Sequence, residues 1–124
     1  MADPILQLNN VEAAYGAVKA IRGASLAVPT GAIVTVLGSN GAGKTTILKT
    51  ISGILDPQKG SIVFKNDKLE GRDPAWIVRR GLVHVPEGRE IFPLLTVREN
   101  LLMGAYTRPA SDRGCRRLRG RRRR

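Results

Sequence analysis

The sequence is poor in the residues that build cross-links and metal centres. It holds one cysteine, Cys115, and one histidine, His84, among its 124 residues. A single cysteine excludes a disulfide within the chain, and the two counts together exclude a cysteine-rich or histidine-based zinc site. Aromatic residues make up only 4% of the chain. This shortage argues against a nucleic-acid module that stacks bases on aromatic side chains.

Long apolar runs and a leader-like start are also missing. No apolar stretch approaches the roughly 18 residues that a membrane span needs. The opening Met-Ala-Asp-Pro lacks the basic and apolar regions of a secretory signal peptide, so we expect a cytoplasmic location. The length and the hydrophobic content of 42% are those of one ordinary domain, or of part of a larger one.

Most of the excess positive charge lies at the end of the chain. The net charge is +11, but residues 113–124 contain eight of the 21 basic residues and no acidic one, which leaves 13 basic against 10 acidic residues elsewhere. A nucleic-acid interface needs basic residues spread over a folded face, so we expect no nucleic-acid partner for the body of the protein. Runs of like charge are usually solvated. We therefore expect residues 109–124 to form a disordered Arg-rich tail.

The hydrophobic pattern alternates between strand-like and helical stretches, which predicts an α/β fold. Residues 32–37 are nearly all apolar, which is typical of a strand buried on both faces of a parallel sheet. Thr96, followed by Glu99, forms the signature of a helix N-terminus. The pattern predicts strands over 5–12, 20–28, 32–37, 61–65 and 82–85, and helices from 44 to about 55, over 75–80 and over 97–105.

A glycine-rich loop lies between the predicted strand 32–37 and the helix that follows it. Residues 38–45 match the phosphate-loop pattern G-x-x-x-x-G-K-[ST]. Glycines let consecutive N–H groups point inward at phosphate oxygens, and the helix N-terminus adds its positive dipole end. The lysine supplies a charge for the β- and γ-phosphates, and the first threonine a hydroxyl ligand for Mg²⁺. The predicted nucleotide-binding residues of the loop are Gly38, Ser39, Asn40, Gly41, Ala42, Gly43, Lys44, Thr45 and Thr46.

With these motifs, the chain resembles the N-terminal half of the ATP-binding subunit of an ATP-binding cassette (ABC) transporter. The resemblance covers residues 5–108 and rests on Val11-Glu-Ala-Ala-Tyr-Gly, on the phosphate loop, on the stretch from 51 to 64 and on Leu94-Leu-Thr-Val-Arg-Glu-Asn-Leu. It implies a P-loop NTPase fold with an N-terminal antiparallel β subdomain. It further implies ATP and Mg²⁺ as cofactors, and Tyr15 as the aromatic residue that stacks on adenine.

The segment from Val85 to Pro93 narrows the resemblance. Its Pro-Glu-Gly-Arg is similar to the LivF-type subunits of branched-chain amino-acid importers, whereas most of the family has glutamine where this chain has Glu87. The resemblance places Glu87 near Mg²⁺ and the γ-phosphate, with Thr45 as the other protein ligand. It also implies permease subunits of an inner-membrane importer and a second ATP-binding subunit as partners, on the inner face of the membrane.

Each of these residues also has a plainer interpretation. Tyr15 could be a turn tyrosine packed on the sheet, and Glu87 a solvated loop acid. Trp76 and His84 fit ordinary packing positions in a short helix and a strand. Arg89 and Phe92 fit either a surface for the permease or ordinary loop packing.

Other motifs of the family are not found in the sequence. It contains no Leu-Ser-Gly-Gly-Gln-like segment and no four apolar residues followed by Asp-Glu. We therefore expect the 124-residue chain not to turn over ATP alone, and assign it no catalytic residue. The Arg-rich tail resembles a GC-rich coding region read in the wrong frame, so a frameshift or truncated gene is one hypothesis. The other is a polybasic tail that binds nucleic acid or an anionic membrane.

The leading prediction is the energy-coupling subunit of an importer for branched-chain amino acids, present as an N-terminal fragment. One alternative is a non-catalytic binder of nucleic acid or anionic membranes that acts through its tail. Another is a different phosphate-loop protein such as a small-molecule kinase, which Tyr15 and the Pro-Glu-Gly-Arg segment argue against.

Overall fold

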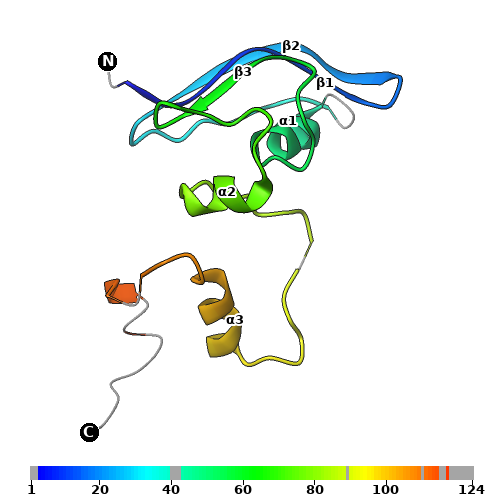
Figure 1. The fold of residues 1–124 in the computed structure, drawn as a ribbon. Helices are drawn as coiled ribbons and strands as arrows, with labels where there is room; N and C mark the ends of the chain where they lie inside the picture. Colours follow the sequence, from blue (N-terminus) through cyan, green and yellow to red (C-terminus); the bar gives the residue numbers. More distant parts are fainter. Residues whose placement is uncertain (1–2, 40–42, 89, 110, 115–116, 118–124) are drawn as a thin grey trace, which may run out of the picture. The chain divides into compact units, whose positions relative to one another are not determined.

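The structure is a computed structural model, and it describes residues 3–39, 43–88, 90–109, 111–114 and 117. The chain divides into two compact units, one ending at His84 and one starting at Val85, and each is described by itself. The second unit contains α3 (Val97–Gly104). The first unit contains β1 (Pro4–Tyr15), β2 (Val18–Pro29), α1 (Lys44–Ile51), β3 (Lys59–Phe64), β4 (Asp67–Lys68) and α2 (Pro74–Arg79) (Figure 1).

The strands of the first unit form one antiparallel sheet in the order β2-β1-β3-β4. β1 and β2 make a long hairpin whose tip pairs Tyr15 with Val18, and Gly16 turns the chain there with a φ of 59°. The expected antiparallel β subdomain is thereby confirmed. The predicted strands 5–12, 20–28 and 61–65 correspond to β1, β2 and β3.

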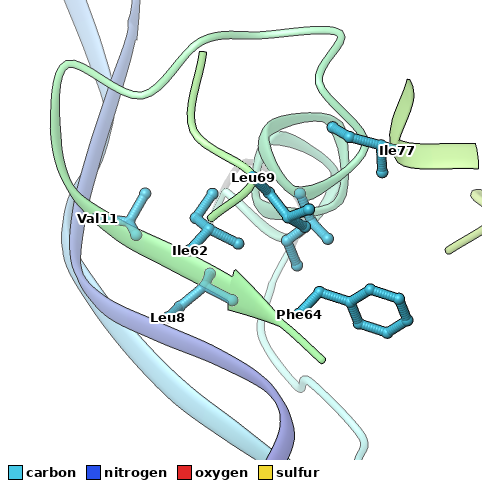
Figure 2. Packing of buried hydrophobic residues seen from close by; sticks show 7 residues of the cluster. Leu8, Val11, Ile62, Phe64, Leu69 and Ile77 are labelled. Atoms are coloured by element: carbon cyan, nitrogen blue, oxygen red, sulfur yellow. The ribbon is translucent and has the colours of Figure 1, made fainter. Parts of the chain in front are cut away.

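One hydrophobic cluster joins the sheet to the two helices of the first unit. Figure 2 shows Leu8 and Val11 of β1 beside Ile62 and Phe64 of β3, facing the helices. Ile51 at the end of α1 belongs to the same cluster. Burying an aliphatic side chain stabilises a fold by about 1.5–3 kcal/mol. The cluster therefore fixes the last turn of α1 against the sheet. Its remaining members are Leu69 and Ile77.

Two predicted strands are wrong. Residues 32–37 and 82–85 belong to no sheet within the described part of the chain. A strand exists only where its backbone N–H and C=O groups pair with a neighbour, and an apolar sequence does not supply that neighbour. The consequence is large exposure of apolar side chains, 97% for Ile33 and 87% for Leu37.

The short helices follow their sequence signals. α2 begins after Asp73, whose carboxylate accepts a hydrogen bond from the N–H of Ala75. α3 begins after Thr96 with a complete capping box, in which Thr96 and Glu99 each accept a hydrogen bond from the other's backbone N–H. Within the described residues, no helix has the length and apolar character that crossing a membrane requires.

Candidate functional site

A cavity of about 380 Å³ lies where the start of α1 meets the start of β2. Three of its lining residues, Val18, Lys19 and Ala20, come from β2. The others come from the end of the predicted phosphate loop and the first turn of α1: Gly43, Lys44, Thr45 and Thr46. The structure thus places β2 next to the segment that matches the phosphate-loop pattern.

Gly43 makes this close approach possible. It is the N-cap residue of α1 and has a φ of 94°, in the left-handed region that L side chains rarely adopt. A Cβ atom built on it would lie 3.0 Å from the carbonyl oxygen of Ala20. A glycine at this position therefore lets the helix N-terminus lie directly against β2.

The side chains at the start of α1 point in different directions. The Nζ of Lys44 donates a hydrogen bond to the carbonyl oxygen of Gly38, the first residue of the phosphate-loop motif. Thr45 is exposed, whereas Thr46 is buried at 9% exposure. Because N–H groups at a helix N-terminus lack partners within the helix, this end of α1 can bind an anion.

The rest of the predicted loop is only partly described. Ser39 is exposed and follows Gly38. The predicted ligands Asn40, Gly41 and Ala42 lie outside the described residues.

Tyr15 lies beside the cavity without lining it. It ends β1, is 48% exposed, and pairs across the hairpin with Val18, which does line the cavity. Its ring is therefore accessible at the tip of the hairpin. Whether Tyr15 stacks on adenine or is a turn tyrosine packed on the sheet stays a prediction.

Lys19 is a residue of the cavity that sequence reasoning missed. Its Nζ lies 3.2 Å from Oε2 of Glu12 on β1, and the same oxygen lies 4.0 Å from Nζ of Lys59 on β3. Of the two lysines, only Lys19 lines the cavity. Nothing in the local sequence distinguishes them, because the approach of β2 to α1 is a contact between distant segments.

Glu87 lies in the second unit, exposed in a bend. The predicted sharing of Mg²⁺ between Glu87 and Thr45 stays a prediction, because the two units are described separately. Among the residues that the structure describes, no three His, Cys, Asp or Glu side chains gather to hold a metal ion. Thr45 does offer a hydroxyl oxygen at the cavity, the kind of donor that Mg²⁺ accepts alongside phosphate oxygens and water.

The second unit has its own hollow, an apolar groove of about 690 Å³ along α3. Asn100 of α3 fixes one wall by bonding both backbone groups of Phe92, at 2.9 Å to its N–H and 3.1 Å to its carbonyl oxygen. Sequence reasoning did not single out Asn100. The apolar side chains that line the groove are Ile91, Phe92, Val97, Leu101, Met103 and Tyr106, each at least half exposed.

Comparisons with known proteins agree on one family. The sequence model described as "ABC transporter" matches residues 21–122. The chain is 40% identical over 108 residues to the high-affinity branched-chain amino acid transport ATP-binding protein BraG of Pseudomonas aeruginosa, covering 87% of this chain and 46% of that protein. It is 34% identical over 117 residues to the ribose import ATP-binding protein RbsA of Cereibacter sphaeroides, covering 90% of this chain and 23% of that protein.

A solved structure shares the fold. The ADP conformation of MJ1267, an ATP-binding cassette of an ABC transporter, superposes with a TM-score of 0.71 at 33% identity. The match covers 83% of this chain and 41% of that one. The chain thus spans less than half the length of each of these three proteins. The P-loop NTPase fold expected from the sequence is confirmed by this likeness.

Proposed function

This chain belongs to the ABC transporter family, and from that premise we propose that it is the part of an ATP-binding subunit that carries the phosphate loop. The proposal rests on one observation above all: the start of α1, with Lys44 and Thr45, opens on a cavity against β2. Family membership removes the small-molecule kinase from the alternatives. The absence of ATP turnover by the isolated chain stays a prediction.

Each group of the proposed nucleotide site has one role. The N–H groups at the start of α1 bind phosphate oxygens together with the loop from Gly38 to Gly43. Lys44 leaves the carbonyl oxygen of Gly38 and binds the β- and γ-phosphates. Thr45 contributes its hydroxyl to Mg²⁺, which supplies charge neutralisation at the phosphates. Tyr15 stacks on the adenine ring.

The proposed transport substrate is a branched-chain amino acid. BraG, whose name gives that substrate, is more similar to this chain than the ribose protein RbsA, at 40% against 34% identity. The Pro-Glu-Gly-Arg segment, with Glu87 in place of the family's usual glutamine, supports the same choice.

The proposed partners are permease subunits and a second ATP-binding subunit, with the chain peripheral to the inner face of the membrane. The segment from Glu87 to Phe92 would contact the permease. The exposed apolar groove along α3 supports this role, because a contiguous apolar surface of this kind marks interaction sites.

Equilibrium titration with ATP tests the nucleotide site. Lys44→Ala should weaken ATP binding at least about tenfold, since a charged partner of the phosphates is lost. Lys49→Ala is the matched control, because Lys49 lies in the last turn of the same helix and does not line the cavity. The proposal fails if the unaltered chain does not bind ATP, or if both variants bind it equally weakly.

Uptake measurements test the substrate. Disrupting the gene should lower the uptake of labelled leucine and leave the uptake of labelled ribose unchanged. The opposite result would assign the chain to a sugar importer while leaving the nucleotide site intact.

A further inference from the structure

We propose that Lys19 is a second cation for the nucleotide's phosphate chain, and that Glu12 is the anion it exchanges for phosphate. This inference rests on the proposed function, because it extends the same cavity. Lys19 lies on β2, outside the phosphate-loop motif, and lines the cavity together with Lys44.

In this structure Lys19 is paired with Glu12, a partner that phosphate can replace. Its Nζ lies 3.2 Å from Oε2 of Glu12, and the lysine side chain is 48% exposed. An ion pair this exposed is weak, so a stronger anion nearby can displace the carboxylate. Lysine suits such an exchange because its ammonium is a compact charge on a flexible stem.

The charge balance of the cavity supports the exchange. Lys44 and the N-terminus of α1 are the positive groups that the motif itself supplies at this cavity. ATP carries about four negative charges, of which Mg²⁺ at Thr45 would offset two, Lys44 one and the helix N-terminus about half of one, so a deficit remains. When Lys19 moves to phosphate, Glu12 keeps an interaction with Lys59, which lies 4.0 Å away on the other side. Glu12 is thus not left without a basic neighbour.

Lys59 also provides the matched control. Both lysines contact the same oxygen of Glu12, and both are charged surface residues on strands of one sheet. Only Lys19 lines the cavity. Neutralising either lysine changes the net charge equally, so a difference between the two variants isolates a direct contact from a general electrostatic effect.

The experiment is calorimetric titration of the full chain with ATP and with AMP at low salt, comparing the unaltered chain with K19M, K19R and K59M. We expect K19M to weaken ATP binding about three- to fivefold and AMP binding less than about twofold, since AMP lacks the β- and γ-phosphates. K19R should stay within about twofold of the unaltered chain. K59M should lose less ATP affinity than K19M, because Lys59 only neighbours Glu12 and does not line the cavity.

Glu12→Gln adds a coupling test. It should tighten ATP binding in the presence of Lys19, because the competing carboxylate charge is gone, and have no such effect in the K19M background.

The outcomes separate this inference from the proposed function. Equal weakening by K19M and K59M, or equal losses for ATP and AMP, would overturn the role of Lys19 while leaving the nucleotide site standing. A Glu12→Gln effect that persists without Lys19 would overturn the exchange. If the unaltered chain binds no ATP, the proposed function itself fails, and the inference fails with it.

Discussion

Replacing Gly43 with alanine is the sharpest test of how the cavity is built. Two costs add at this residue. Holding alanine in a left-handed conformation costs about 1–2 kcal/mol. The new Cβ would also lie 3.0 Å from the carbonyl oxygen of Ala20, closer than ordinary contact, so β2 or α1 must shift by a few tenths of an ångström. We expect a total loss of about 2–3 kcal/mol in the free energy of unfolding.

Gly31→Ala is the control for this prediction. Gly31 also has a left-handed backbone, with a φ of 79°, but a Cβ there would meet no atom within 4 Å. It should show the conformational cost alone, about 1–2 kcal/mol. The difference between the two variants therefore measures the close approach of α1 to β2.

Urea unfolding followed by circular dichroism gives the two stabilities, and titration with ATP gives the affinities. Gly43→Ala should lose both stability and affinity, whereas Gly31→Ala should lose stability alone. Equal loss of stability in the two variants would refute the argument that Gly43 is required for contact with β2. Unchanged ATP affinity in Gly43→Ala would refute the link between that contact and the site.

Three further substitutions test other parts of the molecule. Tyr15→Ala should weaken ATP binding by about 1–3 kcal/mol, whereas Tyr15→Phe should not, since the stacking ring is kept. Equal affinity of the two variants in a fluorescence titration would refute the stacking of Tyr15 on adenine. Ile62→Ala should lower the free energy of unfolding by about 2–5 kcal/mol, because this core side chain is fully buried. A smaller change in urea unfolding would mean that the hydrophobic cluster rearranges to fill the space left by the side chain. Thr96→Ala should cost α3 about 1 kcal/mol, seen as faster amide hydrogen exchange in that helix, while exchange in β1 stays unchanged.

Features that depend on neighbouring residues in sequence could be predicted. The capping box of α3 is an example, because Thr96 and Glu99 bond each other's backbone across one helical turn. The start of α1 after Gly43 is another, since the loop motif and the helical face meet there. In both cases the interacting groups lie within one turn of the chain.

Features that depend on distant segments could not be predicted. Residues 32–37 have the composition of a buried strand, yet a strand needs a partner, and the described sheet supplies none for them. Lys19 was missed for a related reason. Its importance arises from the meeting of β2 with α1, and an alternating strand pattern does not show which of its exposed residues will face a helix.

The position of α1 ties two properties of the protein together. The helix begins at the cavity with Lys44 and ends in the hydrophobic cluster with Ile51. Because both ends belong to one short helix, a ligand that orders the first turn of α1 also orders its last turn. Nucleotide binding and folding of the first unit are therefore thermodynamically linked. At a nucleotide concentration of about 100 times Kd, that linkage amounts to about 2.7 kcal/mol. The thermal midpoint of the first unit should therefore report occupancy of the cavity, even though no residue of the hydrophobic cluster lines it.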